Sequence, residues 1–549
     1  MFFLHLQAFL SRYLKLDGKI DLNGKSQLVQ TLNSDLDATS AGFIERDQKG
    51  QSNLFNYNYW SSPVGTINNT TNNNSYTVGN VMKDGTTATP QNINWTTGYN
   101  GSPTSPITLS SSWIYKFQNL SGVYANWQSV GISGVLNAGQ GFTLKGSGGL
   151  EANQNLTFVG KPNNGFISNP IAANNLNLSG NPYSSSIDAT QIILDNTTST
   201  TGTLYFWEHS PTNNTHVTSG YQGGYAARNL TGGVAPIAPL GITGVGTSAK
   251  IPGRYIPVSQ GFFVYGSTTG GTISFNNNQR LFIKENDIDS NELFKNNSLS
   301  NNITPLAQVY NNSNDEKPED EFKKIRLGFK STDNYYKQAL LGFMENNATE
   351  NIDYGYDGVI LGNSVNDMYF INNNKNLNIQ GVGYFNENAI YPLGVKNNVS
   401  GDVVFKIEEI QNFDINFDAY IFDNVTNTYH DIKNSDFTIA LPQGETNNRF
   451  SLRFLDQSAL ATENFNSLNQ IQIAYTSFNS VLNIKNNVTD ATVETVTLFN
   501  MIGQSVATWN VKDQSQQNIL IPIKNSTAGT YIVKIKTDKG DTSRKIIIN

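Results

Sequence analysis

Alternation of apolar and polar residues is the sequence feature that most constrains this chain. It is clear over residues 325–329, 403–407 and 450–454, where every second residue is apolar. Successive side chains of a β-strand point to opposite faces, so this pattern predicts strands with one buried and one solvated face. Such strands are typical of a β-sandwich.

Composition indicates the same fold class for the rest of the chain. Of the 549 residues, 38% are hydrophobic but only 14% are charged, against roughly 25% charged residues in an average soluble protein. Asn, Ser, Thr and Gly take the place of the charged residues, and they favour turns and strands over helix interiors. We therefore expect an all-β protein with several β-sandwich-like domains in tandem, ending in a small immunoglobulin-like β-sandwich.

Composition also excludes several kinds of chemistry and partner. The chain has no cysteine, which excludes disulfides, thiolate catalysis and Cys-containing metal motifs. A net charge of −7 over this length is too small to indicate a nucleic-acid partner. No apolar run approaches the ~20 residues of a membrane span, so we expect no transmembrane helix.

Changes in charge density, together with Gly and Pro, divide the chain into predicted domains and linkers. Because a solenoid rung cannot bury its apolar face alone, we expect the first of these domains to be truncated, with sequence preceding it. The predicted organisation is the end of a β-solenoid or sheet domain over 1–50, a two-copy β-module over 51–283, a linker over 284–322, a β-sandwich over 323–456, a linker over 457–470 and a C-terminal domain over 471–549.

An imperfect internal repeat supports the two-copy module. A Pro anchor at Pro63 is followed after 77 positions by Gln140, which begins a Gln-Gly-Phe motif. A second anchor at Pro182 is followed after 78 positions by Gln260 and the same motif. Anchors at nearly constant spacing predict two copies of one β-module that pack side by side.

The C-terminal domain carries several motifs in a fixed order. They include a Gly-Gln turn, a Gly-x-Tyr strand and a basic-then-apolar terminal strand, and together they resemble the type A C-terminal sorting domain of type IX secretion substrates. The chain departs from that family at 474–479, where Ala-Tyr-Thr-Ser-Phe-Asn replaces the usual Tyr-Pro-Asn-Pro type segment. The residues that carry the resemblance are Gly503, Gln504, Gly529, Tyr531, Lys534, Gly540, Arg544, Lys545, Ile546, Ile547 and Ile548.

This resemblance implies a route and a partner. The protein would be handled by the type IX secretion machinery of the outer membrane and would become extracellular or attached to the outer-membrane surface. An exposed terminal strand offers backbone groups for β-addition, and we expect Ile546–Ile548 to carry that contact. The upstream region, including 353–358, is similar to non-catalytic stretches of large surface proteins from gliding bacteria.

Two sets of residues are candidates for ligand binding. Flat aromatic rings stack on the apolar faces of sugars, and Trp60, Trp113, Trp127 and Trp207 are the candidates for such a platform, although aromatic residues of strands are more often part of a core. Asp353 and Asp357 are candidate calcium ligands in a turn, the alternative being solvated carboxylates. No other cofactor is indicated.

We therefore expect an exported cell-surface or secreted protein with an adhesive or structural role. The alternative is an extracellular carbohydrate-binding or glycan-processing accessory protein, and a hydrolase with its site in this chain is the third reading. No motif of a catalytic nucleophile or phosphate loop is present, so we expect no enzymatic activity.

Overall fold

The computed structural model divides the chain into two compact units, Met1–Phe454 and Leu455–Asn549. Strands dominate both units, and the α-helices among the described residues are short: α1 (Val78–Val81) and α2 (Ala189–Asp195). The prediction of an all-β fold is therefore confirmed. The structure describes residues 8–10, 12–123, 126–209, 214–217, 223–236, 238–239, 251–283, 321–362, 364–413, 417–457, 471–488, 491–513, 517–524 and 526–548.

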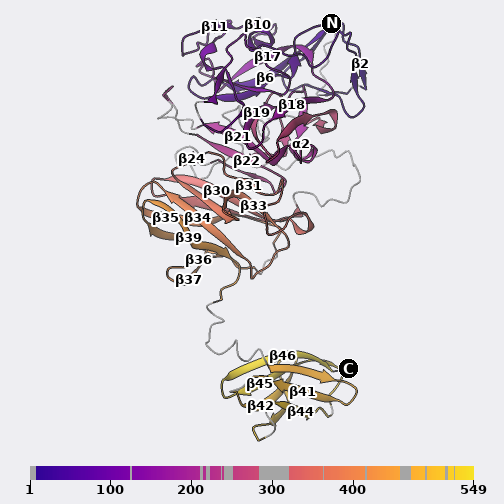
Figure 1. Cartoon of the computed structure of the whole chain (residues 1–549), viewed down its shortest axis with the longest axis vertical. Helices are drawn as coiled ribbons and strands as arrows, with labels where there is room; N and C mark the ends of the chain where they lie inside the picture. The colour runs from indigo at the N-terminus through magenta and orange to yellow at the C-terminus, as the bar shows by residue number, and fades with distance from the viewer. Residues whose placement is uncertain are drawn as a thin grey trace. The chain divides into compact units, whose positions relative to one another are not determined.

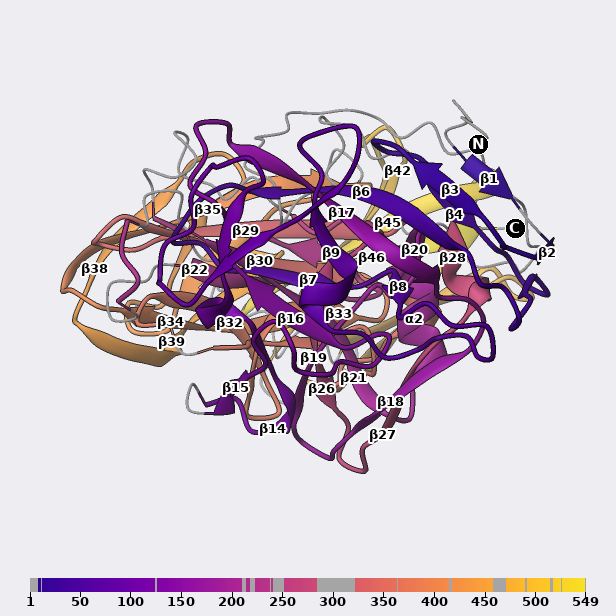
Figure 2. The ribbon, with the colours of Figure 1, turned by 90° about the horizontal axis from the view of Figure 1, so that it is seen from above.

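The N-terminal strands pair in parallel, as the stacked turns of a solenoid do. Leu28, Leu36 and Ile44 are buried on the inner side of these turns. The last N-terminal strand also pairs antiparallel with β17 (Asn153–Pro162), which joins the turns to the next segment (Figure 2). The parallel pairs are β1 (Ala8–Leu10) with β4 (Gln27–Val29), β2 (Tyr13–Leu14) with β5 (Asp35–Leu36), and β3 (Lys19–Leu22) with β6 (Phe43–Gln51).

The internal repeat corresponds to two strand pairs with the same register. In each copy, the strand before the Pro anchor pairs antiparallel with the strand that carries the Gly-Phe motif. The copies also form one bridge in each direction, Trp60 with Gln260 and Gln140 with Ser179. The two copies therefore interlock. The pairs are β7 (Asn58–Ser61) with β16 (Gly141–Leu144), and β19 (Leu176–Gly180) with β26 (Gly261–Gly266).

A six-stranded sheet continues the second copy toward the following segment (Figure 1). Its buried side chains Leu178 and Phe263 share one apolar cluster with Leu340 and Ile379. The predicted domains on either side of the predicted linker 284–322 thus lie in the same compact unit. Residues 284–320 are outside the described part of the chain. The sheet order is β14 (Gln118–Leu120), β19, β26, β21 (Thr200–His209), β22 (Gly223–Arg228), β23 (Gly233–Val234).

A 12-stranded sheet, which follows the repeat module in the chain for most of its strands, also belongs to the first unit. Apolar side chains from both halves of the sheet meet in one buried cluster, so the sheet folds over on itself around a single core. Along its main path the order is β37 (Thr428–Asp431), β36 (Tyr420–Asp423), β39 (Gly444–Arg453), β34 (Ile390–Asn397), β32 (Asp367–Asn372), β33 (Lys375–Val382), β30 (Tyr335–Phe343), β29 (Lys323–Lys330), β35 (Gly401–Gln411), β38 (Phe437–Leu441).

The alternating pattern that predicts β29 describes one of its faces correctly. Ile325, Leu327 and Phe329 are buried in the core, as expected. The prediction of a solvated opposite face is wrong, because Lys324 and Arg326 are also buried, at 4% and 7% exposed. The Arg326 guanidinium donates a hydrogen bond to the carbonyl of Gly233 in the preceding sheet, so this polar face packs against the repeat module.

The second compact unit is a sandwich of two sheets around its own core. The core includes Val496, Leu498, Val533 and Ile535. The predicted linker 457–470 lies outside the described residues, except for residue 457. One sheet has the order β40 (Ile471–Thr476), β41 (Val481–Asn486), β44 (Asn518–Pro522); the other has β43 (Ser505–Asn510), β42 (Val493–Asn500), β45 (Gly529–Thr537), β46 (Gly540–Ile548).

Candidate functional site

The Gly-Gln turn of the C-terminal unit is built on Asn500. Asn500 accepts hydrogen bonds at Oδ1 from the backbone N–H of Ile502 and Gln504, at 3.2 and 2.9 Å. Gly503 has φ +80°, a conformation that glycine adopts without steric cost. The turn presents Met501 and Ile502 to solvent, 61% and 78% exposed. These two apolar residues at the tip lie within the motif segment, but sequence reasoning did not single them out as site residues.

The Gly-x-Tyr strand alternates as predicted. Tyr531 is buried and its hydroxyl donates to the carbonyl of Thr527, at 2.9 Å. On the opposite face, Lys534 forms an ion pair of 2.9 Å with Asp541 on β46. A Cβ at Gly529 would make ordinary van der Waals contact with Tyr531, at 3.7 Å, so this position does not require glycine sterically.

The terminal strand β46 lies at the edge of its sheet and pairs only with β45 in the described part of the chain. The expectation that Ile546–Ile548 carry the export contact, through β-addition to the strand's backbone, stays a prediction. Ile546 and Ile548 lie in the core, whereas Ile547 is 61% exposed. Strand side chains alternate between faces, so β46 exposes its backbone edge and the Ile547 side chain.

The basic residues and the glycine of the terminal hairpin remain accessible. Arg544 and Lys545 are exposed. Gly540 closes the hairpin opposite Thr537 and has φ +134°, where other residues are strained. The motif residues thus divide into those that shape turns, those that fill the core and those that face solvent.

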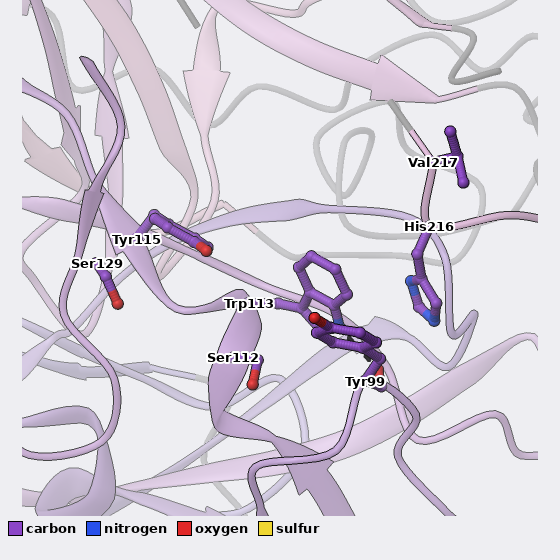
Figure 3. Close-up of a pocket in the computed structure, with 7 residues that line it drawn as sticks. All are labelled: Tyr99, Ser112, Trp113, Tyr115, Ser129, His216 and Val217. Atoms are coloured by element: carbon purple, nitrogen blue, oxygen red, sulfur yellow. Dashed lines mark hydrogen bonds between the residues drawn. The ribbon is translucent and has the colours of Figure 1, made fainter. Parts of the chain in front are cut away.

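A pocket of about 630 Å³ lies on the surface of the first unit (Figure 3). It is formed by the loop after β11 (Asn94–Thr96), by the 3-10 helix η1 (Ser111–Trp113), by the paired strands β13 (Tyr115–Lys116) and β15 (Gln128–Ser129), and by residues 216–217. The lining residues are Tyr99, Ser112, Trp113, Tyr115, Ser129, His216 and Val217.

Trp113 is the fixed centre of this pocket. Its indole N–H donates to the carbonyl of Tyr99 at 2.7 Å, and the Tyr99 ring lies 5.2 Å from it. His216 stacks on the indole at 4.9 Å, with an angle of 20° between the rings. The Nζ of Lys145 lies 3.9 Å from the indole centroid and 3.1 Å from His216 Nδ1. These distances place Lys145 and His216 over the same face of Trp113.

Burial affects the two basic groups that lie over Trp113. Lys145 is 3% exposed, and burial lowers the pKa of its ammonium group to about 7. Burial first, and then the charge of Lys145, lower the pKa of His216. The aromatic faces of Trp113 and Tyr57, each about 4 Å away, stabilise the ammonium group by cation–π attraction. Tyr57, Tyr99 and Lys145 are missed by a search for tryptophans alone.

The other three tryptophans named as sugar platforms belong to cores. Trp60 is 1% exposed and packs against Phe158, so the prediction is wrong for this residue. Trp127 and Trp207 are partly buried against the cluster that contains Phe263. Only Trp113 among the four lines the pocket.

The Asp353 and Asp357 carboxylates serve a turn in this structure. Asp353 Oδ2 accepts from the backbone and hydroxyl of Thr349, at 2.6 and 2.8 Å. Asp357 accepts from the backbone N–H of Asp353 and Gly381, at 2.7 and 3.2 Å. Burial raises the pKa of Asp357 to about 7. Within the described ranges, no group of three or more His, Cys, Asp or Glu residues is arranged to hold a metal ion.

Comparison with known families assigns most of the chain. Residues 67–454 match the family described as "Domain of unknown function (DUF8693)". The chain belongs to this family. The DUF8693 region ends at Phe454, which is also the last residue of the first compact unit.

The remainder of this DUF8693 protein has a separate assignment. Residues 478–549 match the family described as "Secretion system C-terminal sorting domain". This confirms the predicted type IX secretion substrate with its C-terminal sorting domain, which directs the protein to the cell surface or the extracellular space. In the described part of the DUF8693 protein, no helix is long and apolar enough to cross a membrane.

Comparison of the DUF8693 protein with curated proteins and with solved structures gives no further assignment. No curated protein matches it. One similar solved structure is titled "Biofilm associated protein - BSP domain", with 10% sequence identity, 70% of this chain and 81% of that chain covered, and a TM-score of 0.14.

Proposed function

We propose that the DUF8693 region acts outside the cell as an adhesive or structural element, without catalytic activity. The observation that carries this proposal is the low charge of residues 51–283, which hold eight basic and five acidic residues. A surface with little net charge associates readily with other surfaces, because little electrostatic repulsion has to be overcome. Its many amides and hydroxyls can hydrogen-bond to the surface that it meets.

The proposal is tested by adhesion of particles coated with the full chain. Beads that carry the protein should bind to whole cells and to glass more strongly than beads coated with albumin. Raising NaCl from 0.05 to 0.5 M shortens the Debye length severalfold and would weaken binding that depends on charge. The proposed interaction does not depend on charge, so binding of the beads should change less than about twofold over this range. Binding no stronger than that of albumin beads would exclude the adhesive role.

A second candidate function is carbohydrate binding as an accessory of glycan processing. The pocket at Trp113 favours this candidate, because it combines aromatic rings with hydroxyl groups in one concave surface.

A further inference from the structure

We infer that the pocket at Tyr99 and Trp113 binds a short neutral oligosaccharide and is the ligand site of the exported body. The inference rests on the proposed function, because it names the ligand through which the body would attach. It is argued from the aromatic rings, the polar groups and the size of the pocket.

Tyr99 supplies an accessible aromatic face at the pocket. Its side chain is 66% exposed although it belongs to a well-anchored loop. The anchor is the hydrogen bond from the Trp113 indole to the Tyr99 carbonyl. Figure 3 shows the two rings close together at the centre of the pocket, with His216 beside them. A large exposed ring that is held in place loses little entropy on binding, which suits it to stack on a sugar.

The cluster behind the pocket fixes Trp113. Lys145 and His216 cover one face of the indole, and Tyr57 packs against it edge-on at 5.9 Å. His216 is held in turn at Nε2, which lies 2.7 Å from Asn100 Oδ1. This support makes Lys145 a positioning residue, since its ammonium group is enclosed by rings and does not line the pocket.

The polar groups of the pocket favour a neutral ligand. Ser112, Tyr115 and Ser129 bring hydroxyls to the lining, and none of the described lining residues carries a carboxylate, ammonium or guanidinium group. The Ser112 hydroxyl donates to the carbonyl of Thr97 at 2.8 Å, which leaves its oxygen lone pairs to accept from a ligand hydroxyl. An anionic sugar would find no lining cation to pair with, whereas sugar hydroxyls find several partners.

The size of the pocket indicates a short ligand. A volume of about 630 Å³ lies within the range of roughly 300–1,000 Å³ that is typical of small-molecule sites. The pocket can therefore accommodate a short oligosaccharide at the surface. A longer chain would extend out of the pocket past the exposed Tyr99.

The experiment compares the full chain with three variants on a microarray of neutral, sialylated and sulfated oligosaccharides. The wild type should bind neutral oligosaccharides in a saturable way. Tyr99→Ala should bind at least about tenfold more weakly, which corresponds to ~1.4 kcal/mol. Tyr99→Phe keeps the ring and should stay within about threefold of the wild type, a difference below ~0.7 kcal/mol. Tyr384→Ala is the matched control, because Tyr384 is 60% exposed and lies outside the pocket.

Three results would overturn the inference: no binding to any printed sugar, binding to acidic sugars alone, or equal binding by Tyr99→Ala and the wild type. Bead adhesion with the same proteins separates this inference from the proposed function. If Tyr99→Ala beads adhere as well as wild-type beads and no sugar is bound, the adhesive role stands and the site falls. If wild-type beads do not adhere but bind neutral sugars through Tyr99, the site stands and the adhesive role falls.

Discussion

At the scale of single residues, Lys145 shows how a buried charge can be tolerated beside a pocket. Taking an ammonium group out of water disfavours its charged form, and the lowered pKa of about 7 records that cost. Two aromatic faces and the His216 ring offset part of it. The residue therefore supports Trp113 at some expense of stability near neutral pH.

This balance predicts a pH-dependent difference between the wild type and Lys145→Met. Between pH 7 and the ordinary pKa of 10.5, the folded state binds fewer protons at Lys145 than the unfolded state does, so the stability of the wild type rises with pH across that window. Relative to Lys145→Met, the wild type should gain at least about 1 kcal/mol from pH 7 to pH 10. Denaturant unfolding of both proteins at a series of pH values measures this, and parallel curves would contradict it.

Gly503 gives a second prediction at the residue scale. Nothing lies within 4 Å of a Cβ placed there, so Gly503→Ala should be destabilising through its φ of +80° alone, by about 1 kcal/mol. Gly529→Ala is the matched control in the same unit, because its backbone is outside the left-handed region; its effect should stay within about 0.5 kcal/mol. Hydrogen exchange of the amides of β42 and β45 in the full chain reports both effects. Equal protection in the two variants would refute this account of the turn.

At the scale of elements, β46 is an edge strand with one face in the core and one in solvent. Ile546→Lys would place an ammonium group among Val533, Ile535 and their neighbours, and should cost at least about 3 kcal/mol. Ile547→Lys changes an exposed side chain and should change stability by less than about 0.5 kcal/mol. Thermal unfolding and hydrogen exchange of β45 measure the difference. Similar losses in both variants would mean that β46 is not seated as described.

At the scale of the whole molecule, the chain joins the DUF8693 region to a sorting domain that forms a compact unit by itself. A sorting domain with its own core does not depend on the body for its buried contacts. We therefore expect residues 455–549 to carry a periplasmic reporter to the cell surface or the medium in a bacterium with the type IX machinery. The same fusion with Ile546→Lys is the control and should stay in the periplasm. Retention of the unaltered fusion would contradict the separability of the two units.

The sequence by itself determined the strands and the destination of this protein. Alternation over 325–329 predicts a buried strand face, whatever packs against the other face of the strand. The motifs of 498–549 are local in sequence and occur in a fixed order, so they can be recognised without knowledge of the fold. Tertiary structure decided which of the four tryptophans reaches a pocket. Trp60 and Trp113 both belong to aromatic segments, but contact with Phe158 buries Trp60. Trp113 instead meets Tyr99 from the preceding loop and His216 from a segment distant in sequence. Burial of this kind depends on what packs against a strand, and the strand's own residues do not encode that.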